Sequence, residues 1–244
     1  PGVDLGAPSS YPITTNGTLS DTETIPSDGI IVARGNSAAT TLNPFITDIN
    51  TVRGQESGYC TWNPLDKNTN ITLSNGNLDA AYLSSADHYS GRATFKYPTT
   101  GKWYYESTIT TLGGACCIGV DNSGIWNANL SDNGVYLILV NSSNNVQRYL
   151  GSSMTSFDSA YGNPAVGSVL QVAYDADTDE LWLGMNNVWM GSGSSANGNP
   201  GAGTEATASN VSDPFPVTNL VSSAISANFG QKPFKFPPPD GFQP

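Results

Sequence analysis

The chain contains a single histidine, His88, whose neighbours include the residue types of a hydrolase triad. It lies in the segment SSADHYSGR, beside Ser85, Asp87 and Ser90. A triad is defined by geometry in the fold, so residues adjacent in sequence do not make one. No serine of the chain occupies a Gly-x-Ser-x-Gly turn. The sequence therefore predicts a surface or strand-edge histidine and no catalytic residue.

Four acidic residues form the densest carboxylate cluster: Asp175, Asp177, Asp179 and Glu180. Paired carboxylates serve glycosidases, and Asp-x-Asp-x-Asp also begins a calcium loop. The glycine that such a loop needs at its sixth position is replaced by Glu180, and no glutamate closes it. A hairpin turn explains the cluster better, because Asp favours turns. A weak cation site is the alternative. Glu106, alone in WYYEST, is expected to be half-buried and hydrogen-bonded.

The three cysteines, Cys60, Cys116 and Cys117, do not indicate a disulfide framework, because their number is odd. Adjacent residues on a strand face opposite ways, so one of Cys116 and Cys117 should enter the core. A zinc site with His88 would lack the usual ligand spacing. We therefore expect no metal and no cofactor.

Aromatic residues in polar, glycine-containing segments are the candidate ligand-binding residues. These are Trp126 and Asn127 in DNSGIWNANLSDN, Tyr161 in SFDSAYGNP, and Trp189 in NNVWMGSG. Aromatic faces beside Asn and Asp suit sugars, and loops on a rigid scaffold carry recognition. The alternative is that Tyr161 and Trp189 pack in the core, which leaves Trp126 as the best loop candidate.

The composition indicates how these residues are positioned. Charged residues make up only 12% of the 244-residue chain, about half the usual share. Good helix formers are scarce and turn residues abundant, which favours many short strands. The net charge of −11 would repel nucleic acid and anionic membrane surfaces. No apolar run is long enough to span a membrane.

Strand signals recur from Tyr59 onward, each bounded by turn residues. We expect a hairpin at Asn75-Gly76, strands at 94–97 and 102–111, and a separate buried strand in ACCIGVD. Further hairpins are expected to turn at 142–145 and between Tyr174 and Leu181. This spacing, without helical segments, favours an all-β sandwich.

Residues 1–55 differ from the rest, being polar and punctuated by Pro and Gly. They are expected to form an extended arm or linker with a short strand at 30–33. One interpretation is that these residues form a disordered tail. We favour a segment that docks on a neighbouring subunit, because Ile30, Ile31 and Phe45 would be costly to leave in water. The chain begins at Pro1 rather than Met, which indicates a processed form or a piece of a longer polypeptide.

Four segments in order resemble a SPRY domain over residues 58–244: GKWYYEST, CIGVD, the stretch 159–193 and NFGQKPFKFPPPDGF. In particular, the sequence resembles the SPRY-like modules of bacteriophage structural proteins. The resemblance implies a bent antiparallel two-sheet β-sandwich, jelly-roll-type, over residues 56–244, and a binding role without chemistry. The sequence departs from the pattern at Asn187, where such hairpins carry Gly, and in the long loop that follows Trp189.

The C-terminal segment 228–244 is expected to cross the sandwich as a rigid strap. Pro237–Pro239 need no ladder donors, and the aromatic residues Phe229, Phe234, Phe236 and Phe242 would enter the core. Deleting residues 228–244 is predicted to prevent soluble folding, since burying each aromatic contributes roughly 1.5–3 kcal/mol.

The leading functional hypothesis is a virion protein that is no enzyme. It would be a SPRY-like module of a phage tail fibre or appendage that binds a host surface glycan or protein. The arm would attach it to other virion subunits, and a homotrimer is compatible with a fibre. Alternatives are a capsid decoration or assembly protein, a cellular adaptor for short peptides, and a glycan-cleaving enzyme that uses Asp177 or Asp179.

Overall fold

The computed structural model describes residues 60–85, 87–122, 134–151, 153–157 and 161–244. They form 13 strands and no helix. The strands are β1 (Trp62–Lys67), β2 (Thr72–Ser74), β3 (Asp79–Tyr82), β4 (Tyr89–Ala93), β5 (Lys102–Asp121), β6 (Val135–Asn141), β7 (Val146–Leu150), β8 (Ser153–Ser156), β9 (Val169–Asp175), β10 (Glu180–Met185), β11 (Val188–Trp189), β12 (Ala208–Ser209) and β13 (Phe215–Asn228). Within these ranges no helix is long and apolar enough to cross a membrane. The predicted arm, 1–55, lies outside them.

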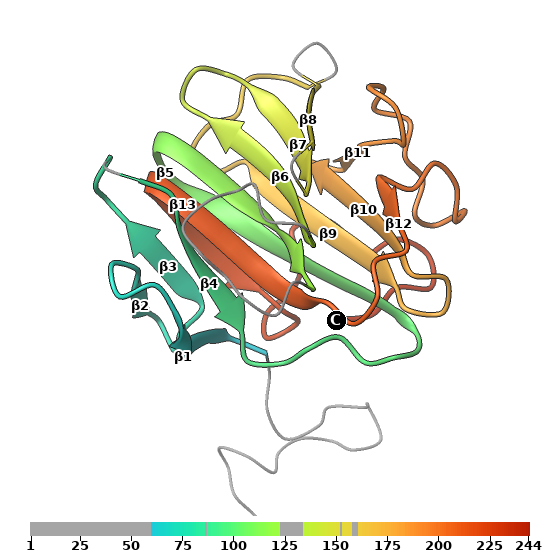
Figure 1. Cartoon of the computed structure of the whole chain (residues 1–244), viewed down its shortest axis with the longest axis horizontal. Coiled ribbons are helices and arrows are strands. Elements are labelled where there is room, and N and C mark those ends of the chain that lie inside the picture. Colours follow the sequence, from blue (N-terminus) through green and yellow to red (C-terminus); the bar gives the residue numbers. More distant parts are fainter. Residues whose placement is uncertain (1–59, 86, 123–133, 152, 158–160) are drawn as a thin grey trace, which may run out of the picture. The chain divides into compact units, whose positions relative to one another are not determined.

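Two long strands belong to both layers of the sandwich. The carboxyl-terminal half of β5 and the amino-terminal half of β13 lie in sheet A, of order β1-β4-β13-β5-β6-β7-β8. Their other halves lie in sheet B, of order β2-β3-β13-β5-β9-β10, with β11 and β12 on the far side of β10. Figure 1 shows β5 and β13 side by side through the centre of the domain. The expected all-β, bent two-sheet sandwich is confirmed.

The bend lies where β5 carries Gly113 and Gly114 opposite Ser222 of β13. The pairing register shifts between Val221 and Ser223, and Ser222 has a φ of 47°. A Cβ on Gly114 would lie 2.6 Å from the Val221 carbonyl oxygen, so only glycine allows the strands to approach this closely. We expected two separate strands here. That prediction was wrong, because the two glycines bend the strand without ending it.

The core lies between the two sheets and is built by alternation along the strands. Ile118 of β5 and Ile138 of β6 face Val172 of β9 and Leu183 of β10 across it, and all four are fully buried. Two smaller apolar clusters lie on the outer faces of the sheets. One contains Leu137 of sheet A, and the other surrounds Trp182 of sheet B.

The hairpins follow the local turn signals. The turn after β2 is confirmed, with four residues, Asn75 to Leu78, and positive φ at the first three. The turns at 142–145 and between Tyr174 and Leu181 are also confirmed. The prediction of a strand at 94–97 was wrong, because β4 ends at Ala93. The Tyr97 N–H donates to the Pro214 carbonyl and not to a neighbouring strand.

Candidate functional site

A polar cluster on the outer face of sheet A contains the single histidine of the chain, His88, which is half-buried. Asn219 of β13 is fully buried, and its Nδ2 donates to Ser90 Oγ at 2.7 Å. Its Oδ1 lies 2.7 Å from His88 Nδ1 and 3.9 Å from Cys117 Sγ. Cys, His and Asn are the residue types of a thiol hydrolase, but here the histidine bonds to the asparagine and not to the cysteine.

The cysteine of this cluster is held as a thiol. Cys117 is 0% exposed, and burial raises its pKa well above the ordinary value of 9.0. Cys116 points into the main core, where burial raises its pKa to about 12. The two adjacent side chains therefore face opposite sides of β5, as expected. A thiolate is the reactive form of cysteine, and neither environment favours it.

The acidic hairpin between β9 and β10 uses its carboxylates to bind its own turn and the start of β5. Asp175 Oδ1 accepts from the Asp177 N–H at 3.0 Å, and its Oδ2 pairs with Lys102 Nζ at 3.0 Å. Asp179 Oδ1 accepts from the Tyr174 hydroxyl at 3.1 Å. In the part of the chain that the structure describes, no three His, Cys, Asp or Glu side chains gather as a metal site.

Glu106 is more buried than the sequence indicated. Its side chain lies on the outer face of sheet B, and the residue is 3% exposed. The carboxylate accepts from the Tyr104 hydroxyl at 3.0 Å and from the Lys235 N–H at 2.7 Å. Longer contacts come from the Phe236 N–H and from Asn228 Nδ2. Glu106 thus fastens the C-terminal segment to the sheet.

The hydrogen bonds continue from Glu106 through two further buried residues of sheet B. The Tyr104 hydroxyl accepts from Gln171 Nε2 at 2.9 Å. Gln171 is fully buried, and its Oε1 accepts from the Asn187 N–H at the tip of the β10–β11 hairpin. Sequence reasoning missed Gln171, whose only signal is a polar residue inside a continuous apolar strand.

Asn187 adopts a φ of 65°, and the preceding Asn186 adopts 51°. Asparagine tolerates this left-handed conformation better than most residues. The departure from glycine at this turn therefore leaves the hairpin intact.

Two of the four ligand-binding candidates, Trp189 and Tyr161, lie within the described residues. Trp189 is 8% exposed and packs with Trp182 and Tyr104 on the outer face of sheet B. Tyr161 is half-buried beside Phe157, and its hydroxyl donates to the Val188 carbonyl at 3.0 Å. Trp126 and Asn127 lie outside the described residues.

The base of the Trp126 connection is described on both sides. β5 ends at Asp121 and β6 begins at Val135, and these two residues pair directly. The Asn122 N–H donates to the Gly134 carbonyl at 3.0 Å. The connection that carries Trp126 and Asn127 therefore joins the adjacent ends of two interior strands of sheet A.

Arg148 of β7 is a buried cation that the sequence did not single out. Its guanidinium donates to the carbonyls of Gly191, Ser192 and Thr207 at 2.6, 2.8 and 3.3 Å. It also lies over the Phe157 ring, 5.4 Å from the centroid. Burial lowers its pKa from the ordinary value. Arg148 therefore fixes both ends of the glycine-rich loop that follows β11.

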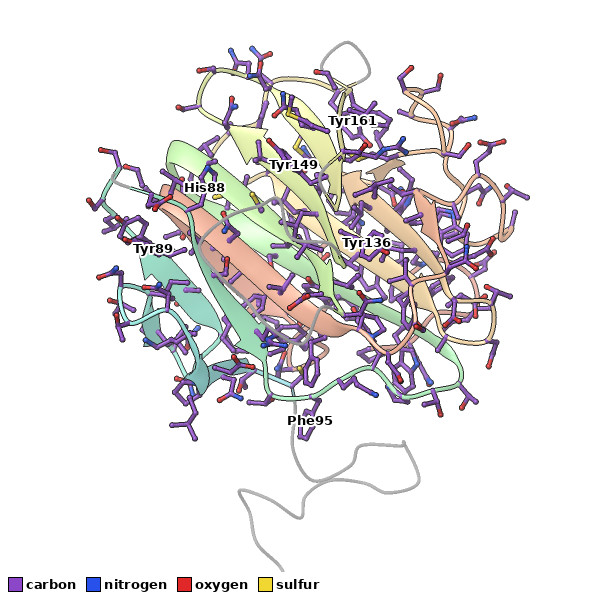
Figure 2. The ribbon with its side chains drawn as sticks, in the orientation of Figure 1. His88, Tyr89, Phe95, Tyr136, Tyr149 and Tyr161 are labelled. Atoms are coloured by element: carbon purple, nitrogen blue, oxygen red, sulfur yellow. The ribbon has the colours of Figure 1, made fainter. Side chains whose placement is uncertain are left out.

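An accessible aromatic and sulfur pair lies on the outer face of sheet A. Tyr149 of β7 and Met154 of β8 are direct cross-strand partners, so their side chains share this face. Met154 is 54% exposed, and Tyr149 is half-buried against Leu137 and its neighbours. Figure 2 shows Tyr149 and His88 over this sheet.

Comparison with solved structures identifies the fold. The SPRY domain of human HERC1 matches with a TM-score of 0.51 and 14% identity, covering 70% of this chain and 99% of that one. The PSpry domain of TRIM65 matches with a TM-score of 0.50 and 10% identity, covering 70% and 92%. No family model and no curated protein matches the sequence. The domain is therefore SPRY-like in fold.

Proposed function

We propose that this chain is a non-enzymatic structural and binding protein of a virion. It is a SPRY-like module of a phage tail fibre or tail appendage that recognises a host surface glycan or protein. Recognition is supported by the side chains on the outer face of sheet A. There Tyr149 and Met154 are accessible on the sheet that anchors the connection with Trp126 and Asn127. Rigid aromatic side chains beside small polar ones suit such contacts.

The absence of catalysis is part of this proposal and is supported by how the reactive residue types are used. Cys117 is buried as a thiol, His88 bonds to Asn219, and Glu106 is occupied by structural donors. Asp177, which a glycosidase would need free, accepts from the Gly101 N–H at 3.1 Å. Each of these four groups has a hydrogen-bond partner within the protein, and of the four only Asp177 is exposed.

The virion location rests on the likeness of the sequence to phage structural modules and on its polar first 55 residues. These residues would join the module to other virion subunits, in a homotrimer if the parent is a fibre. The net charge of −11 opposes nucleic acid as a partner. Incorporation into particles but no binding to host surfaces would instead favour the capsid decoration role.

The test is a glycan array and a host-surface binding assay with the purified chain. We expect saturable binding that falls roughly tenfold or more in Trp126→Ala and in Tyr149→Ala, since a lost stacking contact of about 1.4 kcal/mol is tenfold. Phe95→Ala is the matched control, because Phe95 is exposed and Figure 2 shows it at the opposite end of the domain from Tyr149. Equal binding by all variants, or turnover of the glycan, would refute the proposal.

A further inference from the structure

The outer face of sheet B is covered by the end of the chain itself. We call residues 230–244 the C-terminal strap. Phe242 of the strap packs edge-on against Trp182 at 6.2 Å between ring centroids, and Phe234 packs against Tyr104 at 4.9 Å. Trp189 completes the same cluster. Without the strap, three large aromatic side chains of the sheet would meet water.

Polar contacts fix the strap to the same face. The N–H groups of Lys235 and Phe236 donate to Glu106, and Lys235 Nζ donates to the Gly167 carbonyl at 2.7 Å. Gln243 pairs in parallel with Trp103 of β5. Its N–H donates to the Lys102 carbonyl at 3.0 Å. This bridge lies beyond the end of β13, which stops opposite Glu106.

The strap is a self-contained unit joined to β13 by one turn. Asn228 closes that turn, because its Oδ1 accepts from the Gly230 N–H and its Nδ2 donates to the Lys232 carbonyl. Gly230, with a φ of 104°, lies against Pro244, so the two ends of the strap meet. The strap carries two lysines and one aspartate in a chain of net charge −11, so its charge complements the body of the domain.

We propose that the aromatic surface of Tyr104, Trp182 and Trp189, with Glu106 beside it, is a peptide-binding site, and that its occupant in trans is the C-terminal strap of a second copy of this chain. The resident strap shows the ligand chemistry: two aromatic anchors eight residues apart, two backbone N–H groups for a buried carboxylate, and one strand bridge. This inference is independent of the proposed function.

The resident strap competes with any added segment. A short tether gives an effective concentration of about millimolar, so a second strap displaces the first only when the first is weakened. The site is therefore tested in full-length chains whose own strap has lost an anchor, and the probe is a labelled synthetic peptide of residues 230–244.

We expect this peptide to bind full-length Phe242→Ala saturably, to raise its Tm, and to bind the wild-type chain at least tenfold more weakly. A peptide with Phe234→Ala and Phe242→Ala should not bind. Phe95→Ala, whose strap is intact, is the control chain and should behave as wild type. If Phe242→Ala does not fold, Phe234→Ala and Glu106→Gln weaken the strap at the half-buried anchor and at the carboxylate. Absence of saturable binding to the folded variants, or equal binding of the substituted peptide, would overturn the proposal.

Discussion

Glu106 and Arg148 are buried charges that bond to backbone groups rather than to side chains of opposite charge. Glu106 accepts from two strap N–H groups, and Arg148 donates to three loop carbonyls. Hydrogen bonds to ionised groups are stronger than neutral ones, so each charge is stabilised by the segment that it orders. In both cases an irregular segment is fixed by one side chain from a regular strand.

Replacing Arg148 tests this role. In Arg148→Lys the charge remains, but one ammonium cannot reproduce the fork that reaches three carbonyls. We expect a loss of about 1–3 kcal/mol in the free energy of unfolding, measured in urea, because buried acceptors are left unpaired. Proteolysis within residues 191–207 should also become faster.

Lys96→Met is the matched control for the arginine. Lys96 pairs with Asp213 at 2.7 Å, but both side chains are well exposed. Such surface pairs contribute about 0–1 kcal/mol. If Arg148→Lys changes stability no more than Lys96→Met does, the arginine does not order the loop.

Sequence reasoning identified residues whose role follows from their own neighbourhood. Glu106 was expected to be hydrogen-bonded because it alternates with core residues. Arg148 was missed because its acceptors lie 43, 44 and 59 positions away. Asn219 was missed for the same reason, since Ser90 is 129 positions away. A single sequence carries no signal for such pairings.

At the scale of elements, the hairpins were predictable and the long strands were not. Turns are set by a few consecutive residues, such as Asn75 and Gly76, whose backbones take positive φ values. The pair Gly113-Gly114 also consists of residues that favour turns, but it lies within one 20-residue strand. Whether glycine ends a strand or bends it depends on the strand opposite, which local pattern does not specify.

Gly114→Ala tests the bend. The added Cβ would lie 2.6 Å from the Val221 carbonyl oxygen, so β5 and β13 must separate locally. We expect a loss of about 1–3 kcal/mol in unfolding free energy, as for overpacked cores, measured by chemical denaturation. Gly193→Ala is the control, because a Cβ there meets nothing within 4 Å. Similar stability of the two variants would mean that the bend does not require glycine.

At the scale of the whole molecule, buried thiols and phenols link stability to alkaline pH. Burial raises the pKa of Cys117 above 9.0 and the pKa values of Tyr97 and Tyr105 well above 10.0. The folded chain therefore keeps protons that the unfolded chain releases. This contribution to stability is complete below about pH 8 and falls as pH rises past the ordinary cysteine and tyrosine values.

We expect the Tm, followed by circular dichroism, to be constant between pH 7 and 8 and to fall progressively from about pH 9 to 10.5. For each buried group, the free energy of unfolding falls by about 1.4 kcal/mol per pH unit above the ordinary pKa of that group. Cys117→Ala should reduce the slope. A Tm that does not change up to pH 10.5 would contradict this assignment.

Deletion of residues 228–244 is predicted to abolish cooperative folding. It removes Phe229, which packs between Trp62 at 5.2 Å and Tyr105 at 5.0 Å in the main core. Deletion of residues 231–244 keeps Phe229, so that chain should fold with a lowered Tm. A cooperative melt of the longer deletion would show that Phe229 is dispensable.

β5 and β13 each pass from one sheet into the other without a break. A force applied to sheet A, which carries Tyr149, is therefore transmitted to sheet B, which carries Trp182, along two covalent backbones and not through side-chain contacts alone. The layers cannot slide past each other without stretching these strands. A module built in this way can hold a load at the proposed recognition surface while its shape stays constant.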